Sequence, residues 1–401
     1  MSVTTILRER FAASMMPNYG VPEIVLEHGN GCTVHDVDGK AYLDLVAGIA
    51  VSALGHNHPA LVAAVTRQIT TIAHTSNLYI HPTEVELAER LLHLLGADGK
   101  VFFANSGTEA NECAVKLAIT HARATGRRYL VAARDGFHGR SLGALALTGK
   151  DAIREPFGPY GIDVRFVDYG DAAALSAAVT DECAAVFVEP IQGEAGVVPP
   201  PDGYLAAVRE VCDATGALFV VDEIQSGIGR TGAWFAHQHA GVLPDIVTVA
   251  KGLAGGLPIG ACIGVGRYGD LFDKGAHGST FGGNPVACAA ALAVLDTVAD
   301  EGLLAAAVEL GDHLAAGIVG LGHPAVTGVR GRGLWRGITL AADIATGVAE
   351  ALRGAGFLVN PVRPDVIRLA PPLVVSRTEL DSFLFALPAA LDAAYPPGGR
   401  S

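Results

Sequence analysis

The sequence contains ALFVVDEIQ at residues 217–225 and DIVTVAKGL at residues 245–253, two near-continuous apolar runs followed by charged or polar residues. A third run of this kind, AAVFVEP, lies at 184–190, and a helix-patterned segment at 202–215 follows it. Such runs, alternating with helices, are typical of a mainly parallel sheet whose strands are buried on both faces. Ligands bind these sheets beyond the carboxyl ends of the strands, so we expect a site there.

Strand and helix patterns continue on both sides of these runs. VFFAN (101–105) leads into a helix-patterned segment that Gly126 ends. Earlier in the chain, GCTVHDVDGKAYLDL (31–45) has the alternation and the Asp-Gly turn of a hairpin. Later, an Ala/Leu-rich helical stretch precedes two strand-like runs, GVRGRGLWRGITL (328–340) and VIRLAPPLVV (366–375).

The predicted fold class is α/β, with a large domain built on a mainly parallel central sheet flanked by helices and a smaller α+β domain. A length of 401 residues suits two domains. We predict an N-terminal arm that joins the small domain at 1–55, the large domain at 56–295 and the C-terminal small domain at 296–401. The end of the chain, PPGGRS (396–401), is expected to form a frayed tail.

The composition favours a compact enzyme. Half of the residues are hydrophobic, 17% are charged and the net charge is −13, with no Lys/Arg-rich block. Nucleic acids and anionic membranes, which need clustered positive charge, are therefore not expected as partners.

No run reaches the ~18–20 apolar residues of a membrane span, and charged residues at 8–10 interrupt the N-terminal stretch, unlike a secretory signal. Six dispersed cysteines without a CxxC pair favour a reduced, cytoplasmic protein.

A segment at the end of one predicted strand could bind phosphate. Residues 105–111 run from a strand into a helix through Ser106, Gly107 and Thr108. The unpaired N–H groups and positive dipole end of a helix N-terminus, together with two hydroxyls, suit a phosphate group. The alternative interpretation is an ordinary helix cap.

Asp222 and Lys251 lie at the ends of two apolar runs. Asp222 is either a solvated loop carboxylate or a buried anion that keeps a cationic ring nitrogen protonated. Lys251 is either a surface lysine or a desolvated amine of the kind that Schiff-base chemistry requires. One cofactor, pyridoxal 5′-phosphate (PLP), matches all three features in this order on successive strand ends. It needs a phosphate-binding segment, an acid that faces its ring nitrogen and a lysine that forms an imine.

Motifs of other enzyme classes are weak. GIGRTG (227–232) and GVGRYG (264–269) fit GxGxxG, but among 50 glycines about 0.8 chance matches are expected, and neither opens an apolar helix after a strand. An NAD-dependent dehydrogenase is therefore a distant alternative. There is no P-loop motif and no GxSxG. The histidine pairs at 56–58 and 237–239 lack ligand neighbours at suitable spacing, so no metal site is predicted.

The motifs of almost the whole chain resemble those of the class III (ω-amino) aminotransferases. The similarity covers residues 18–59 and then FFANSGTEANECAVKLA, FHGRSLGALALTG, VEPIQGEAGV, VVDEIQSGIGRTG, VAKGLAGGLPIGA, GSTFGGNP and VIRLAPPL. The resemblance implies PLP as cofactor, PLP fold type I, and an obligate homodimer whose active sites lie at the subunit interface.

The resemblance also implies the residues that hold the cofactor. Lys251 matches the catalytic Schiff-base lysine, and Asp222 matches the partner of the ring nitrogen. Phe137 matches the aromatic ring stacked on the cofactor, and Gln225 the group that binds its phenolic oxygen. The implied phosphate ligands are Ser106, Gly107, Thr108 and, from the neighbouring subunit, Thr280.

Four further residues match substrate-binding positions. Arg140 matches the arginine that binds the substrate α-carboxylate, for which a fork of donors is suited, and Ser279 matches a position near the same substrate. Arg368 matches a second arginine, and Glu194 its carboxylate partner. Glu194 would neutralise Arg368 when an ornithine-type substrate binds, whereas with glutamate Arg368 would take the α-carboxylate.

The implied reaction transfers the δ-amino group of N2-acetyl-L-ornithine to 2-oxoglutarate, in arginine biosynthesis. It gives N-acetyl-L-glutamate 5-semialdehyde and L-glutamate. Apolar contacts separate related substrates by only ~1–3 kcal/mol per group. Succinyldiaminopimelate, succinylornithine, ornithine and 4-aminobutyrate therefore stay open as donors. A non-catalytic protein with the same fold is the alternative from another class.

Overall fold

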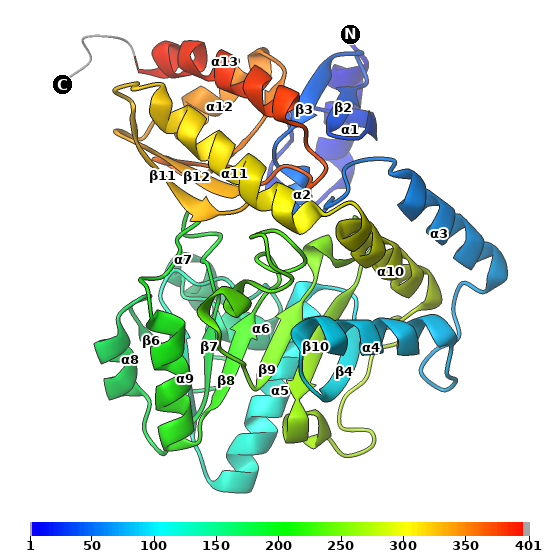
Figure 1. Ribbon diagram of the computed structural model, residues 1–401, viewed down its shortest axis with the longest axis vertical. Coiled ribbons are helices and arrows are strands. Elements are labelled where there is room, and N and C mark those ends of the chain that lie inside the picture. The colour runs from blue at the N-terminus through cyan, green and yellow to red at the C-terminus, as the bar shows by residue number, and fades with distance from the viewer. Residues whose placement is uncertain (1, 396–401) are drawn as a thin grey trace.

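The computed structural model describes residues 2–395, so the tail predicted at 396–401 lies outside the described residues. Figure 1 shows two lobes: a large lobe that holds the central sheet, and a smaller lobe formed by the early and late parts of the chain.

A seven-stranded sheet forms the centre of the large lobe. Its strands are β4 (Gly99–Ala104), β5 (Tyr129–Ala133), β6 (Val164–Val167), β7 (Cys183–Val188), β8 (Leu218–Asp222), β9 (Ile246–Val249) and β10 (Gly260–Val265). They lie in the order β4-β10-β9-β8-β7-β5-β6, and β6, β5, β7, β8 and β9 are parallel. Only β10 runs antiparallel to its neighbours, β4 and β9. The predicted mainly parallel sheet is thus confirmed.

Helices cover both faces of this sheet. On one face lie α5 (Gly107–Thr125) and α6 (Leu142–Leu147), and on the other lie α8 (Ala172–Ala178) and α9 (Tyr204–Thr215). Along β8, Leu218 and Val220 pack in the cluster with α5, while Phe219 and Val221 pack in the cluster with α9. This alternation explains why the strand is apolar at successive positions, because neither of its faces meets water.

Three longer helices and several shorter elements occur elsewhere in the described chain. The longer helices are α3 (Pro59–Thr71), α4 (Pro82–Leu95) and α10 (Pro285–Asp300). The shorter elements are α2 (Ala47–Ala50), α7 (Asp151–Arg154), η1 (Pro17–Tyr19), η2 (Glu155–Phe157), η3 (Ala236–Ala240), η4 (Lys251–Ala254) and η5 (Gly266–Asp270).

The small lobe contains two four-stranded sheets. The first joins β1 (Leu26–Asn30), β2 (Thr33–Asp36), β3 (Ala41–Asp44) and β13 (Phe357–Leu358); the second joins β11 (Val326–Arg332), β12 (Trp335–Leu340), β15 (Val366–Leu369) and β14 (Asn360–Arg363). Its helices are α1 (Val3–Ser14), α11 (Leu303–Gly320), α12 (Ala345–Gly354) and α13 (Arg377–Ala394).

The early and late parts of the chain meet in the first of these sheets. The predicted hairpin is present as β2 and β3, which pair antiparallel around a turn in which Gly39 has a φ of 87°. β13 pairs with β3 in parallel, with Phe357 opposite Leu43.

The predicted domain boundaries stay a prediction, and the one between 295 and 296 falls inside α10.

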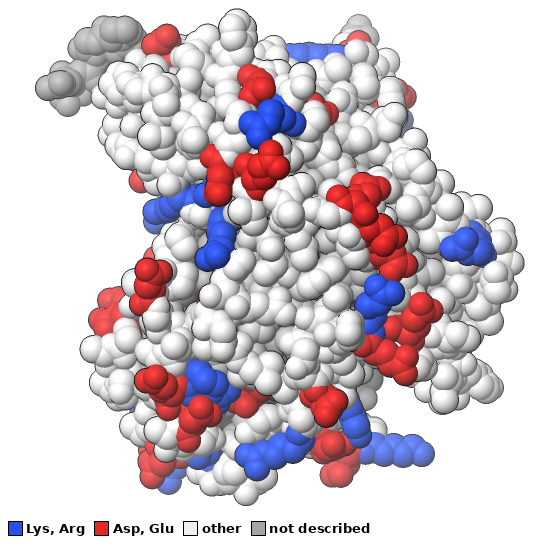
Figure 2. All heavy atoms as spheres, viewed as in Figure 1, with Lys and Arg blue, Asp and Glu red and all other residues white. Residues whose placement is uncertain are grey.

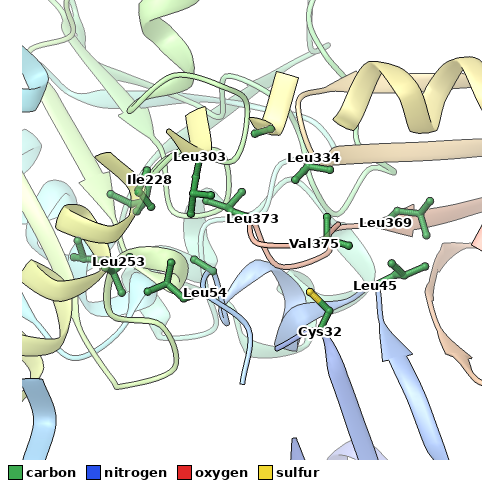
Figure 3. Packing of buried hydrophobic residues seen from close by; sticks show 14 of the residues in the cluster. Cys32, Leu45, Leu54, Ile228, Leu253, Leu303, Leu334, Leu369, Leu373 and Val375 are labelled. Atoms are coloured by element: carbon green, nitrogen blue, oxygen red, sulfur yellow. The ribbon is translucent and has the colours of Figure 1, made fainter. Parts of the chain in front are cut away.

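The two lobes share one apolar core. Figure 3 shows Leu54, Ile228 and Leu253 near Leu303 and Leu373, all of which belong to a single buried cluster. This cluster extends into both small sheets and onto α10. The relative position of the lobes is therefore fixed by apolar packing, which matters because the site residues come from both.

One helix in the described part of the chain, α11, is long and apolar enough to cross a membrane, judged by length and composition alone. Its buried residues, however, recur at helical spacing from Leu303 through Leu314 to Ile318, and they pack in the shared core. Such a face is that of a packed surface helix. On the side of the molecule in Figure 2, basic and acidic side chains lie next to one another in small groups.

Candidate active site

A cavity of about 370 Å³ opens beyond the carboxyl ends of β7, β8 and β9. This is the edge at which the sequence predicted a site. Of the predicted site residues, those that line the cavity are Ser106, Gly107, Thr108, Phe137, Arg140, Glu194, Asp222, Gln225 and Lys251.

Lys251 follows β9 and begins η4. Its φ is 42°, in the left-handed region that residues with a side chain rarely adopt, and such strain is found at functional sites. Burial lowers the pKa of Lys251, and the charge of Arg368 lowers it further. The carboxylates Asp222, Glu189 and Glu194 act in the opposite direction on this pKa without outweighing burial. The shift is toward the neutral amine.

Asp222, the last residue of β8, is buried with 4% of its surface exposed. Its Oδ2 accepts hydrogen bonds from Asn111 Nδ2 at 2.7 Å and from His138 Nδ1 at 2.8 Å. Burial alone would lower the pKa of His138, but the hydrogen bond and the charge of Asp222 raise it overall. Thr248 in turn donates to Asn111 Oδ1 at 2.9 Å. A buried carboxylate is thus held in place by donors from α5 and from the loop after β5.

The segment predicted to bind phosphate forms the start of α5. Ser106 caps this helix, since its Oγ accepts from Glu109 N at 3.3 Å, and it also lines the cavity. Thr108 Oγ1 lies 2.6 Å from Ser141 Oγ. A Cβ atom at Gly107 would lie 2.8 Å from Ile224 Cδ1, so this position leaves no room for a side chain. Ser106 is therefore a helix cap and also part of the cavity wall, and its role in binding phosphate stays a prediction.

Phe137 and Gln225 also face the cavity. The Nε2 atom of Gln225 is buried and has no hydrogen-bond partner among residues 2–395, while its Oε1 accepts from Arg368 Nη1 at 3.4 Å. Phe137 N donates to Glu189 Oε2 at 3.1 Å. Burial, assisted by the charge of Asp222, raises the pKa of Glu189 to about 7.

Arg368 on β15 lies directly behind the cavity wall. Its Nη1 donates to Glu194 Oε1 at 2.8 Å, and its Nε and Nη2 donate to Asn360 Oδ1 at 3.1 and 2.8 Å. Burial would raise the pKa of Glu194, but the charge and hydrogen bond of Arg368 lower it overall. The structure therefore brings together the predicted carboxylate and its arginine.

Arg140, Ser279 and Thr280 are placed in three different ways relative to the cavity. The Arg140 guanidinium is exposed, lies 5.6 Å from the centre of the Phe137 ring, and makes no ion pair with a side chain in the described ranges. Ser279 borders the cavity indirectly, because its Oγ accepts from the cavity residue Asn105 at 3.1 Å. Thr280 is exposed and does not line the cavity of its own chain.

Sequence reasoning assigned no role to His138, Asn111 and Glu189. Each lies within a motif already noted, but a buried polar side chain is not recognisable from the sequence of its motif alone. Within residues 2–395, no group of three or more His, Cys, Asp or Glu side chains is arranged to hold a metal ion.

Comparison with known proteins identifies close relatives. The family model described as aminotransferase class-III matches residues 14–391. The chain is 58% identical over 395 residues to the acetylornithine aminotransferase of Mycobacterium tuberculosis, covering 98% of each chain. It is 57% identical over 389 residues to that of Streptomyces coelicolor, covering 97% of this chain and 96% of the relative.

Solved structures agree with this relationship. The N-acetylornithine aminotransferase of Stenotrophomonas maltophilia superposes with a TM-score of 0.82 at 37% identity, covering 94% of this chain and 98% of that one. The ornithine aminotransferase of Toxoplasma gondii, in a structure described as having partial occupancy of PLP at its active site, gives a TM-score of 0.93 at 32% identity. That match covers 98% of this chain and 95% of the other.

Proposed function

The chain belongs to the class III aminotransferases, and on that premise we propose that it transfers the δ-amino group of N-acetylornithine to 2-oxoglutarate. The products are N-acetylglutamate 5-semialdehyde and glutamate, and the step belongs to arginine biosynthesis. The observation that carries this proposal is an identity of 55–58% to relatives named acetylornithine aminotransferase, along nearly the whole length of both chains.

PLP is the cofactor of this family, and the residues of the cavity fit it. The unpartnered Gln225 Nε2 suits the phenolic oxygen of the ring. The N–H groups at the start of α5, with Ser106 and Thr108, suit the phosphate. Phe137 would lie against the ring, and Asp222 would bind its nitrogen. When bound, the cofactor withdraws electrons from the carbon that bears the substrate amine.

Lys251 would hold the cofactor through its amine and then act as the proton carrier. Its neutral Nζ would take a proton from the amine-bearing carbon of the substrate and would later act as an acid by returning a proton. The lowered pKa of Lys251 supports this role, because a charged ammonium could not accept the proton. Asp222, fixed by Asn111 and His138, supplies a negative charge that needs no reorientation during the reaction.

Two arginines would bind the carboxylates of the substrates. Arg140, which makes no ion pair with a side chain of residues 2–395, would bind the α-carboxylate of acetylornithine, with Ser279 beside it. The pair between Arg368 and Glu194 would stay closed over this donor, since the donor brings no second carboxylate. With 2-oxoglutarate or glutamate the pair would open, and Arg368 would bind the α-carboxylate.

A homodimer is the assembly that we infer. Leu78, Tyr79 and Ile80 are 84%, 70% and 86% exposed and form a contiguous apolar segment, and Phe281, beside Thr280, is 60% exposed. Apolar surface of this kind marks an interaction site. A partner subunit covering it would carry its own Thr280 toward the neighbouring phosphate site.

The six cysteines are all free and buried, which supports a cytoplasmic location.

The test of the proposed function is a steady-state panel of amino donors with 2-oxoglutarate. N-Acetylornithine is expected to give the highest kcat/KM. The other donors to be compared are ornithine, succinylornithine, succinyldiaminopimelate and 4-aminobutyrate. A higher kcat/KM for any of these would reassign the donor within the family, and absence of turnover with all five would contradict aminotransferase activity itself.

A further inference from the structure

The carboxylate of Glu194 lies between two cations from different lobes. Its Oε1 accepts from Arg368 Nη1 at 2.8 Å, and its Oε2 lies 3.9 Å from Lys150 Nζ. Lys150 Nζ also donates to the main-chain oxygen of Glu194 at 2.9 Å. The ammonium is therefore anchored beside the carboxylate but bonded to the backbone. Only 21% of the Lys150 side chain is exposed, so this ammonium is partly removed from water.

The main chain around Glu194 is held firmly. Arg330 Nε donates to Gly196 O at 2.8 Å, and the main chains of Gln192 and Val198 exchange two hydrogen bonds of 2.9 Å. Val197 is fully buried with a φ of 57°. Such a turn cannot shift without breaking these contacts. If the ion pair between Arg368 and Glu194 opens, the main chain of Glu194 therefore stays in place and only its side chain can rotate. The new partner of the Glu194 carboxylate must lie within reach of that rotation.

Lys150 meets this condition better than any other cation near Glu194. Three cations lower the pKa of Glu194 against the effect of burial: Arg368 first, then Lys150 and then Lys251. Arg368 is the cation that gives up its contact with Glu194, and Lys251 is engaged in its proposed role with the cofactor. Lys150 remains, at a distance that a small side-chain rotation would convert into a hydrogen-bonded ion pair.

We propose that Lys150 receives the Glu194 carboxylate when Arg368 turns to a substrate carboxylate, and that Lys150 thereby determines the affinity of this site for dicarboxylates. Without Lys150, the released carboxylate would stay partly buried and unpaired, and the closed pair with Arg368 would be favoured. Binding of 2-oxoglutarate, glutamate or any similar dicarboxylate would then be weakened. The donor, which leaves the pair closed, would not meet this cost. The inference rests on the proposed function for the roles of Arg368 and Glu194.

The test compares Lys150→Gln with Lys150→Arg in the holoenzyme. Glutamine keeps a donor for the Glu194 main chain but removes the charge, whereas arginine keeps both. For Lys150→Gln we expect the Kd of glutarate, a non-reacting dicarboxylate, to rise about fivefold or more in calorimetric titration. The ratio of KM for 2-oxoglutarate to KM for the donor should rise by a similar factor. Lys150→Arg should stay within about twofold of the wild type.

A double-variant cycle separates this role from a structural one. In a Glu194→Gln background there is no carboxylate to receive, so Lys150→Gln should no longer change the glutarate Kd. An effect that persists in that background, or equal changes in both KM values, would overturn the proposal. If the wild type fails to use acetylornithine, the proposed donor is wrong, yet the glutarate titrations still decide the role of Lys150.

Discussion

Asp222 keeps its place in a buried site through the three donors that bind its carboxylate. Asn111 and His138 bind the same oxygen, Oδ2, while Oδ1 accepts from Ile224 N at 3.0 Å. A buried carboxylate without such partners would be costly, and the pairing leaves its charge available to a cationic ring.

Asp222→Asn should therefore retain the fold and the cofactor but lose most of the activity. An amide is nearly the same size but carries no charge, so it cannot keep a ring nitrogen protonated. We expect kcat/KM to fall by about a hundredfold or more. Steady-state assays measure the fall, with cofactor absorbance and circular dichroism as controls. Near-normal turnover in a correctly folded variant would remove the ring-nitrogen role.

The raised pKa of Glu189 predicts that the stability of the protein depends on pH. Its pKa is raised from 4.5 to about 7 by burial first, so the folded state favours the neutral acid. A raised carboxyl pKa means that the folded state binds more protons than the unfolded state between these two values. The stabilisation that Glu189 contributes to the folded state is therefore complete at low pH and is lost as the pH rises through about 7.

Glu189→Gln should remove this dependence, because an amide does not titrate but can still accept from Phe137 N. Relative to the variant, the wild type should lose up to roughly 3 kcal/mol in its free energy of unfolding between pH 5 and pH 8. Urea denaturation of both proteins across this range gives the difference. A difference that stays constant with pH would contradict the raised pKa.

At the scale of elements, the start of α5 depends on a close approach between this helix and the loop after β8. Gly107 has no room for a Cβ atom, because Ile224 Cδ1 and Cγ2 would both lie 2.8 Å from it. The absent side chain allows the helix N-terminus and the Asp222 segment to border one cavity. Their separation is fixed by contact between these two residues.

Gly107→Ala should displace Ile224 and weaken retention of the cofactor. We expect the Kd of PLP to rise about tenfold, in line with the ~1–3 kcal/mol typical of overpacking. Ile224→Ala in the same background should restore part of the affinity by making room. Gly320→Ala is the matched control, since a Cβ atom there meets nothing within 4 Å. Unchanged PLP affinity in Gly107→Ala would show that this contact does not shape the site.

At the scale of the whole molecule, one chain leaves part of its proposed site incomplete. Thr280 does not reach the cavity of its own chain, and the exposed apolar segment at 78–80 has no cover among residues 2–395. The homodimer proposed above would account for both observations, because a second copy of the chain would cover the segment and complete the phosphate site.

Ile80→Glu should dissociate this dimer and abolish most activity, because it places a charge in the covered surface. Phe385→Glu on α13 is the matched control: Phe385 is 90% exposed but lies far along the chain, in the small lobe. Light scattering after gel filtration measures the mass of each variant. A fully active monomer would contradict the shared site, and a dimer of Ile80→Glu with wild-type activity would contradict the placement of residues 78–80 in the interface.

Much of the fold followed from local patterns. The continuous apolar runs of β7 and β8 predicted strands buried on both faces, and the Asp-Gly turn predicted the hairpin of β2 and β3, as the structure has them. The antiparallel direction of β10 and the pairing of β13 with β3 were not predicted. These contacts join segments that are distant in the chain, and no local pattern encodes the direction in which a chain returns.

The sequence by itself determined the family, the cofactor and the strand ends at which Asp222 and Lys251 stand, because apolar periodicity and motif order are properties of the chain. Only the tertiary structure decided which polar groups meet: the donors that hold Asp222, the buried acid Glu189, and the position of Glu194 between Arg368 and Lys150. The physical reason is that burial and charge pairing depend on distances in space, and packing of the two lobes sets those distances.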